Sequence, residues 1–212
     1  MSNNESFIDE VNEEVRRDQL FTYIRKYGWI AALTVTGLVG ATAWTEYQSA
    51  QTRAAEQAAG DAIFDALEQN EWADRQAAFA QLPPSVMSLL MTGAAAQEAG
   101  DTAASADAFN ALANLDGARQ VYRDLGAFKA LLANAENLST DERIAGFQNL
   151  AAPGATFALL AKEQIAVAQL EAGDAEAALA TLREISGDAT VTQGLRNRVE
   201  GLIVALGGDA SQ

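Results

Sequence analysis

The pattern of hydrophobic and polar positions separates one uninterrupted apolar run from a long segment with helical periodicity. The run covers residues 27–45 (YGWIAALTVTGLVGATAWT) and contains no charge between Arg25-Lys26 and Glu46. As a helix, such a run extends about 28 Å, close to the ~30 Å hydrocarbon thickness of a bilayer. It therefore predicts a transmembrane helix that separates a tail, residues 1–26, from the rest of the chain.

The tail carries a short pattern that is typical of an amphipathic helix. Phe7, Val11 and Val15 recur every four residues, and Ser6 precedes them as a candidate N-cap. A frayed polar tail is the alternative, because isolated helices this short are marginally stable in water.

Beyond the apolar run, pairs of large hydrophobic residues recur at a nearly constant interval. The two members of each pair are three residues apart, which places both on one helix face. Their leading residues are 30, 38 and 35 positions apart, close to the ~34-residue period of tetratricopeptide-type repeats. The sequence thus predicts an all-α fold: a helical extension, 46–69, then a tetratricopeptide-like α-solenoid of helical hairpins over 70–212. The pairs, whose leading residues are the expected repeat anchors, are Phe79 with Leu82, Phe109 with Leu112, Phe147 with Leu150, and Leu182 with Ile185.

Turn signals occur between these pairs. Ala-Gly-Asp stands at 99–101 and again at 172–174, where Gly is expected to end one helix and Asp to cap the next. Ser139 and Glu142 form a capping-box signature at the corresponding place in another unit, and residues 70–71 are expected to cap the first. An irregular alanine-rich bundle with chance periodicity is the alternative to repeats.

Composition limits the chemistry. The chain has no Cys and no His, so it lacks thiol nucleophiles, thiolate metal sites and the commonest general base. Its net charge of −15 argues against binding to nucleic acid or anionic lipid. Phosphate-binding glycine loops, nucleophile elbows and Asp-x-Asp calcium loops are also missing. We therefore predict no catalytic, metal or cofactor-binding residues, and the alternative is a hydrolase that uses carboxylates.

Charges beside the apolar run predict its orientation. Arg16, Arg17, Arg25 and Lys26 lie within about 15 residues before it, whereas only Arg53 lies that close after it. Because cations accumulate on the cytoplasmic side, a cytoplasmic N-terminus and a periplasmic C-terminal domain are expected, in a single-pass protein of the cell inner membrane.

The apolar run has two alternatives to an anchor. Ala41-Thr42-Ala43 fits a signal-peptide cleavage site, and cleavage after Ala43 would release a soluble periplasmic protein. A long acidic tail, a long apolar run, and Trp29 and Trp44 near its two ends favour an uncleaved anchor. A buried core helix is the other alternative, and it would need apolar segments around it that the sequence lacks.

A row of small residues, Ala32, Thr36 and Gly40, lies along one face of the expected span. Such rows let membrane helices approach closely, so these residues are a candidate contact with another membrane helix. The alternative is that small residues are simply common in membrane spans.

The order of these parts resembles the ancillary SecYEG translocon subunit family (YfgM-like). The resemblance covers nearly the full length and rests on architecture, on Arg25-Lys26-Tyr27-Gly28 at the entry to the apolar run, and on the Ala-Gly-Asp turns. It implies a tetratricopeptide-like periplasmic domain on an inner-membrane protein that accompanies the protein-export channel. It also implies cooperation with periplasmic chaperones on emerging chains, and it offers no catalytic residues.

The function expected from the sequence is therefore that of a membrane-anchored scaffold with chaperone-like activity. It would assist the Sec translocon and hand over exported proteins through protein–protein contacts, with no nucleic acid and no small-molecule substrate. An acidic groove in such a scaffold would favour basic or unfolded segments. A scaffold for another cell-envelope assembly, such as a division or respiratory complex, is the alternative.

Overall fold

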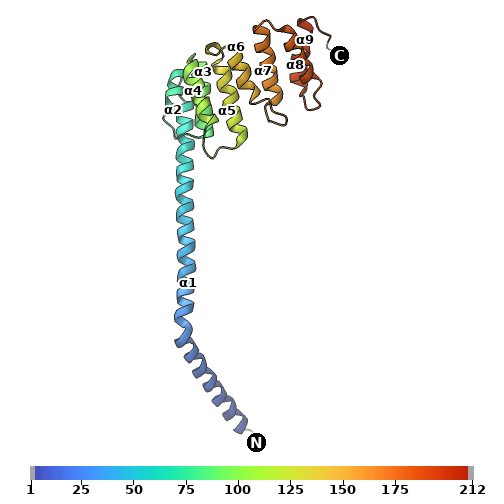
Figure 1. Cartoon of the computed structure of the whole chain (residues 1–212). Helices are drawn as coiled ribbons and strands as arrows, with labels where there is room; N and C mark the ends of the chain where they lie inside the picture. Colours follow the sequence, from blue (N-terminus) through green and yellow to red (C-terminus); the bar gives the residue numbers. More distant parts are fainter. Residues whose placement is uncertain (1–2, 210–212) are drawn as a thin grey trace. The chain divides into compact units, whose positions relative to one another are not determined.

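The structure is a computed structural model that describes the backbone of residues 3–209 and the side chains of residues 25–30 and 33–209. Within these residues all regular structure is helical, and consecutive α-helices pack in pairs (Figure 1), so the all-α class predicted from the sequence is confirmed. Two compact units, Met1–Ala59 and Gly60–Gln212, are described separately. The helices are α1 (Asn3–Leu67), α2 (Trp72–Ala80), α3 (Val86–Glu98), α4 (Thr102–Ala113), α5 (Gln120–Ala133), the 3-10 helix η1 (Ala135–Asn137), α6 (Thr140–Gln148), α7 (Ala158–Glu171), α8 (Ala175–Ser186) and α9 (Gln193–Ala205).

Helix α1 includes almost all of the predicted tail, the apolar run and the helical extension. The three segments therefore share one helix rather than forming separate elements. The amphipathic pattern predicted for Phe7, Val11 and Val15 lies outside the described side chains.

The apolar run lies in the one helix, among the described residues, that is long and apolar enough to cross a membrane. Its large side chains are exposed, and Trp29, Leu38 and Trp44 have exposed fractions of 62%, 62% and 63%. Thr34 and Thr42 donate hydroxyl hydrogen bonds to the carbonyl oxygens four residues earlier, at 2.9 and 3.1 Å. Their polar groups are therefore satisfied inside the helix, as a hydrocarbon environment requires. The exposure is that of a candidate span and not of a buried core helix.

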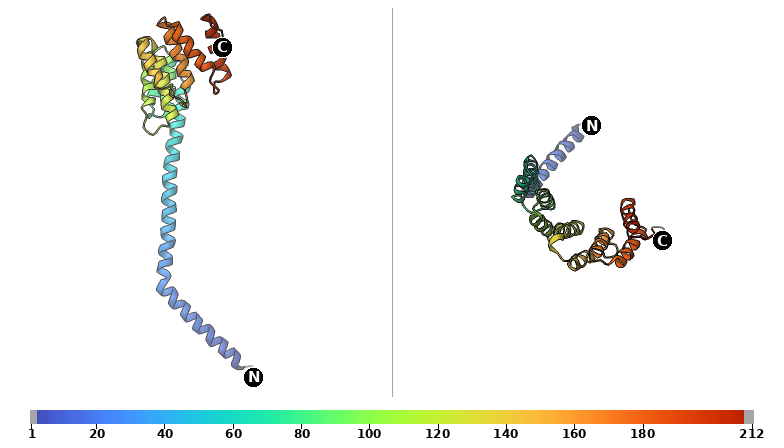
Figure 2. Two further views of the ribbon diagram at one scale, coloured as in Figure 1. Left: turned by 45° about the vertical axis from the view of Figure 1, so that its right-hand side comes forward. Right: turned by 90° about the horizontal axis from the view of Figure 1, so that it is seen from above.

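The second unit, residues 60–212 and called the body from here on, is a row of helices that pack side by side in chain order (Figure 2). Two of its turns have the same geometry. Gly100 and Gly173 have φ angles of 79° and 81°, a left-handed conformation that glycine adopts without strain. The backbone N–H groups of Asp101 and Asp174 each donate to a carbonyl five residues earlier, at 2.8 and 2.9 Å, which completes a Schellman motif.

The same two aspartates begin the next helix. Each carboxylate accepts a hydrogen bond from the backbone N–H three residues later, at 3.0 Å, as the repeated Ala-Gly-Asp sequence predicts. Ser139 and Glu142 form the expected capping box at the start of α6. Glu71 occupies the N-cap position of α2 but its side chain makes no capping bond. Residue 71 thus has the predicted N-cap position, but the predicted capping hydrogen bond is absent. The reason is that Glu is not among the short polar side chains that cap well.

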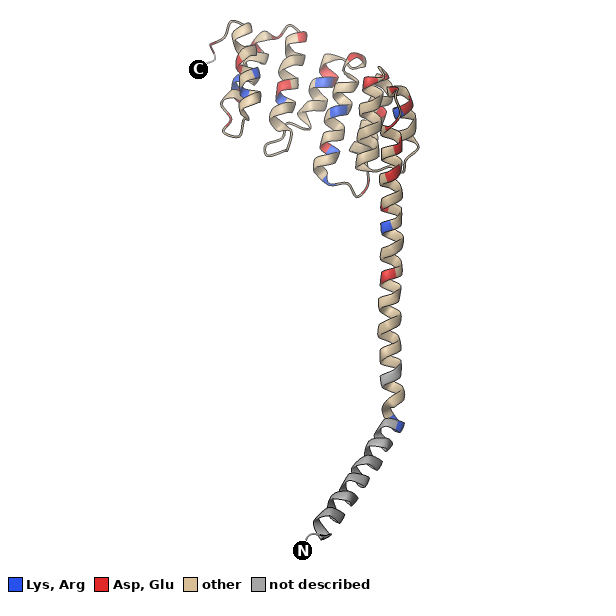
Figure 3. Cartoon of the chain, turned by 180° about the vertical axis from the view of Figure 1, so that it is seen from behind, with Lys and Arg blue, Asp and Glu red and all other residues tan. Residues whose placement is uncertain are grey.

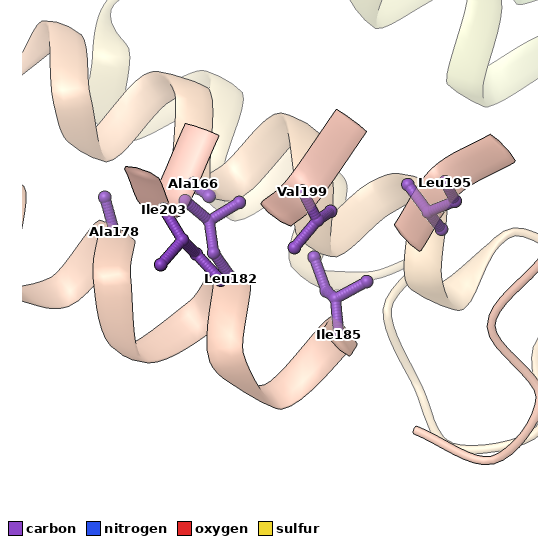
Figure 4. Packing of buried hydrophobic residues seen from close by; sticks show 7 residues of the cluster. All are labelled: Ala166, Ala178, Leu182, Ile185, Leu195, Val199 and Ile203. Carbon is purple, nitrogen blue, oxygen red and sulfur yellow. The ribbon is translucent and has the colours of Figure 1, made fainter. Parts of the chain in front are cut away.

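Three hydrophobic clusters belong to the core, and each is shared by consecutive helices. The first joins the end of α1 with α2 and α3, the second joins α5, α6 and α7, and the third joins α7, α8 and α9. Figure 4 shows the third cluster, in which Leu182 and Ile185 of α8 lie against Val199 and Ile203 of α9. Because Ala66 belongs to the first cluster, the body begins within α1 and ahead of residue 70, where the repeats were predicted to start.

Two helices approach closely at Gly126. A Cβ atom at this position of α5 would lie 2.6 Å from the backbone nitrogen of Ala113 and 2.8 Å from the carbonyl oxygen of Phe109. Both atoms belong to the backbone of α4 and cannot move aside as a flexible side chain can. Glycine at 126 therefore sets the distance between α4 and α5.

We predict that Gly126→Ala destabilises the body by about 1–3 kcal/mol, because the added methyl group forces α4 and α5 apart. Gly201→Ala is the matched control, since no heavy atom outside its own helix backbone lies within 4 Å of the added Cβ atom. It should stabilise α9 by up to about 1 kcal/mol. Urea denaturation of the full chain in detergent, followed by circular dichroism, measures both, and equal midpoints for the two variants would contradict the prediction.

Candidate interaction surface

The predicted repeat anchors lie inside the body. The exposed fractions of Phe79, Phe109, Phe147 and Leu182 are 2%, 1%, 2% and 0%, so these residues hold the helices together and are not available to a partner. The anchors come from α2, α4, α6 and α8, which alternate with the other helices of the body. An interaction surface must therefore be formed mainly by other residues of the body.

The predicted row of small residues in the apolar run is described in part. Thr36 and Gly40 are exposed on α1, and a Cβ atom added to Gly40 would meet nothing within 4 Å. The side chain of Ala32 lies outside the described residues. The described part of the row therefore has room for an approaching helix.

The most buried charge in the described chain belongs to Glu163 of α7, whose side chain is 10% exposed. Arg198 of α9 donates two hydrogen bonds to this carboxylate, at 2.9 and 2.8 Å. The hydrogen bonds to Glu163, together with its negative charge, raise the pKa of Arg198 above its ordinary value. This pair fastens α9 to α7, and both residues are committed to structure.

Two other cations in the second half of the body are also paired. Arg143 of α6 contacts Glu171 of α7 at 2.6 Å, and Lys162 of α7 contacts Glu184 of α8. No group of three or more Asp, Glu, His or Cys residues in the described part of the chain is placed to hold a metal ion.

Two cavities open on the body. One, of about 670 Å³, lies beside the loops before α7 and after α8, and its lining includes the Lys162–Glu184 pair and Asp188. The other, of about 460 Å³, is called the α2–α4 groove here because it lies between α2 and α4, over α3. Its lining residues are Ala73, Gln76, Ala77, Phe79, Ala80, Leu82, Pro84, Ser88, Leu89, Thr92, Ala104, Asp107 and Ala108.

The uncharged polar groups of the α2–α4 groove are already used within the body. The hydroxyl of Ser88 donates to the carbonyl oxygen of Pro83 at 2.8 Å, and the hydroxyl of Thr92 donates to the carbonyl oxygen of Ser88 at 2.8 Å. The amide nitrogen of Gln76 donates to a carboxylate oxygen of Asp101 at 3.1 Å. Asp107 differs, because its exposed carboxylate has no hydrogen-bond or ion-pair partner in the described chain.

Asp101 lies in the turn between α3 and α4 and accepts a hydrogen bond from Gln76, a residue that lines the groove. The backbone N–H of Ala104 and then the side chain of Gln76 stabilise its charged form, and together they lower the pKa of Asp101 below its ordinary value of 3.8. The hydrogen bond from Gln76 also ties α2 to this turn. Sequence reasoning did not find the groove, although Ala73, Ala77 and Ala80 at helical spacing were a usable signal.

Fold and surface together define an all-α protein with one candidate membrane-spanning helix and a body of consecutively packed helix pairs. Comparison of the chain with protein-family models, with curated proteins and with solved structures finds no match. The function must therefore be argued from the surface itself.

We predict that Asp101→Asn weakens the acid sensitivity of the fold. Asn still accepts the capping hydrogen bond but does not titrate. Because the folded-state pKa of Asp101 is lowered, its ionised form stabilises the fold above pH ~4, and this contribution is lost as pH falls through the folded-state pKa. The Tm of the natural protein should exceed that of the variant at neutral pH, and the difference should shrink below pH ~4. A difference that stays constant from neutral to acid pH, in melts followed by circular dichroism, would contradict this.

Proposed function

We propose that this protein is a membrane-tethered scaffold for protein–protein interaction, and that its body is a tetratricopeptide-like α-solenoid. The packing of consecutive helices supports this proposal, as do the buried residues that recur at similar intervals in α2, α4, α6 and α8. The identical turns at Gly100 and Gly173 support it further. Stacked helical hairpins present extended surfaces, and many such proteins use these surfaces to bind other proteins.

The main support for this proposal is the α2–α4 groove. It is open, its lining is mostly apolar, and its one charged lining residue, Asp107, has no partner in the described chain. An apolar groove on a stable body is suited to receive a segment of another protein.

We place the protein in the cell inner membrane as a single-pass protein with a cytoplasmic N-terminus and a periplasmic body. The exposed apolar side chains of α1 support a membrane span, and the excess of cations before the apolar run supports this orientation. A tether of this kind raises the local concentration of the body beside other membrane proteins.

Within this class, we propose that the partner is the Sec translocon and that the body hands over exported proteins together with periplasmic chaperones. The support is the order of tail, apolar run and repeat body, together with the Ala-Gly-Asp turns that resemble the YfgM-like family. Ala32, Thr36 and Gly40 would then contact a helix of the channel. The proposal needs no cofactor, no nucleic acid and no small-molecule substrate.

We predict that the apolar run is retained in the mature protein. The full-length chain should stay in the membrane fraction after alkaline extraction, and N-terminal sequencing should find a start before residue 27. Protease added outside spheroplasts should digest the body and spare the tail. A mature protein that begins at Trp44 would instead be soluble and would contradict the membrane assignment.

The choice of partner is tested by crosslinking the intact protein in native membranes and identifying the products. We expect components of the Sec translocon and periplasmic chaperones, and a lower yield of the channel product for Thr36→Leu because leucine blocks close helix approach. Thr34→Leu, the same change on the opposite face of the helix, should leave the yield unchanged. Products from a division or respiratory complex, without any translocon or chaperone component, would contradict the proposal.

A further inference from the structure

We propose that the α2–α4 groove binds a cationic amphipathic helix of a partner protein, with its apolar face in the groove and a Lys or Arg beside Asp107. This inference rests on the proposed interaction function and specifies its site and the chemistry of its partner.

The walls of the groove suit the side chains of a helix. Ala73, Ala77 and Ala80 follow one another at intervals of four and three residues along α2, and Ala104 and Ala108 face them from α4. Amphipathic helices present their anchoring side chains with the same intervals. Because alanine is short, the walls leave space for large anchors above the apolar floor that Leu82 and Leu89 supply.

The hydrogen bonding of the groove favours a helix over an extended peptide. An extended segment exposes backbone N–H and C=O groups that need partners when they are buried. The hydroxyls of Ser88 and Thr92 and one N–H of the Gln76 amide already donate within the body, so few donor groups remain in the groove. A helix satisfies its own backbone and needs only apolar contact. The same lack of available donors makes the groove poorly suited to a polar small molecule, which needs several such groups to fix its orientation.

The negative charge of the segment that contains the groove favours a cationic helix over an acidic one. Residues 60–118 contain nine acidic residues and a single cation, Arg75, which gives this part of the body a net charge of −8. Arg75 lies over the ring of Trp72 at 4.6 Å and donates to the carbonyl oxygen of Gln69 at 2.6 Å, so it is held beside its own neighbours. The charged positions can be followed in Figure 3. A helix with Lys or Arg beside its apolar face would be attracted to this region, and an acidic helix would be repelled.

The same charge disfavours a second copy of the body as the occupant. Two copies that meet at this groove would each bring the acidic segment 60–118, and the like charges would repel each other at the interface. The second cavity lacks this selectivity, because its Lys162 and Glu184 are of opposite sign and contact each other.

Peptide binding tests the inference with the full chain in nanodiscs of a zwitterionic lipid. Two fluorescent peptides of about 18 residues share one leucine face and carry either Lys or Glu on the other. By anisotropy, with empty nanodiscs as the blank, the Lys peptide should bind at least about tenfold more tightly than the Glu peptide. Equal affinity for the two peptides, or tighter binding of the Glu peptide, would overturn the inference.

Variants locate the binding. Ala77→Trp fills the groove from an exposed position and should weaken binding of the Lys peptide about tenfold. Asp107→Lys should also weaken it, whereas Glu136→Lys makes the same charge change at an exposed site outside the groove and should leave it unchanged. Circular dichroism melts verify that each variant folds. Unchanged binding in a folded Ala77→Trp variant would overturn the inference, as would self-association of the natural protein that this variant abolishes.

Crosslinking in membranes separates this inference from the proposed function. If the natural protein captures its translocon and chaperone partners and the Ala77→Trp variant captures them equally, the scaffold function stands and the groove assignment falls. If Ala77→Trp loses the chaperone products while the channel product that is sensitive to Thr36→Leu persists, both are supported. If the natural protein yields no translocon or chaperone product, the proposed function itself fails.

Discussion

The body depends on the burial of large hydrophobic residues between helix faces that are lined with small residues. Phe109 of α4 and Leu182 of α8 are almost completely buried, and alanines around them, such as Ala106 and Ala178, let the neighbouring helices approach. Removal of one such side chain typically costs 3–5 kcal/mol for Phe and 2–5 kcal/mol for Leu, a large share of the stability of a domain. Because α7 belongs to two clusters, burial on one side of this helix supports burial on the other.

Small residues leave an open groove where no further helix packs against them. Ala77 of α2 and Ala104 of α4 line an open groove instead of a closed contact, and the apolar floor beneath them stays accessible. The property that lets alanine-rich helices pack closely thus also leaves space for the side chains of another helix. The groove is lined mainly by residues of α2, α3 and α4, and it lies where another helix could pack against them.

Charge is distributed unevenly over the body. In α6 to α9, Arg143, Lys162 and Arg198 each contact an acidic residue of a different helix, so their charges serve the fold. Residues 60–118 contain nine acidic residues and only one basic residue, Arg75. Most of these acidic residues therefore have no basic residue of the same segment to pair with. One of these acids, Asp107, lies in the lining of the apolar α2–α4 groove. The apolar run of α1, as a membrane span, would hold this site beside membrane proteins.

The sequence by itself determined the features that depend on local periodicity and composition. The candidate span, the all-α class, the buried anchors such as Phe79 and the turns at Gly100 and Gly173 follow from residues close together in the chain. Only the tertiary structure decided which distant residues meet. The contact of Glu163 with Arg198, the backbone approach at Gly126 and the lining of the groove by three helices depend on how helices are placed against one another. No local pattern encodes that placement, because it results from the combined packing of many side chains.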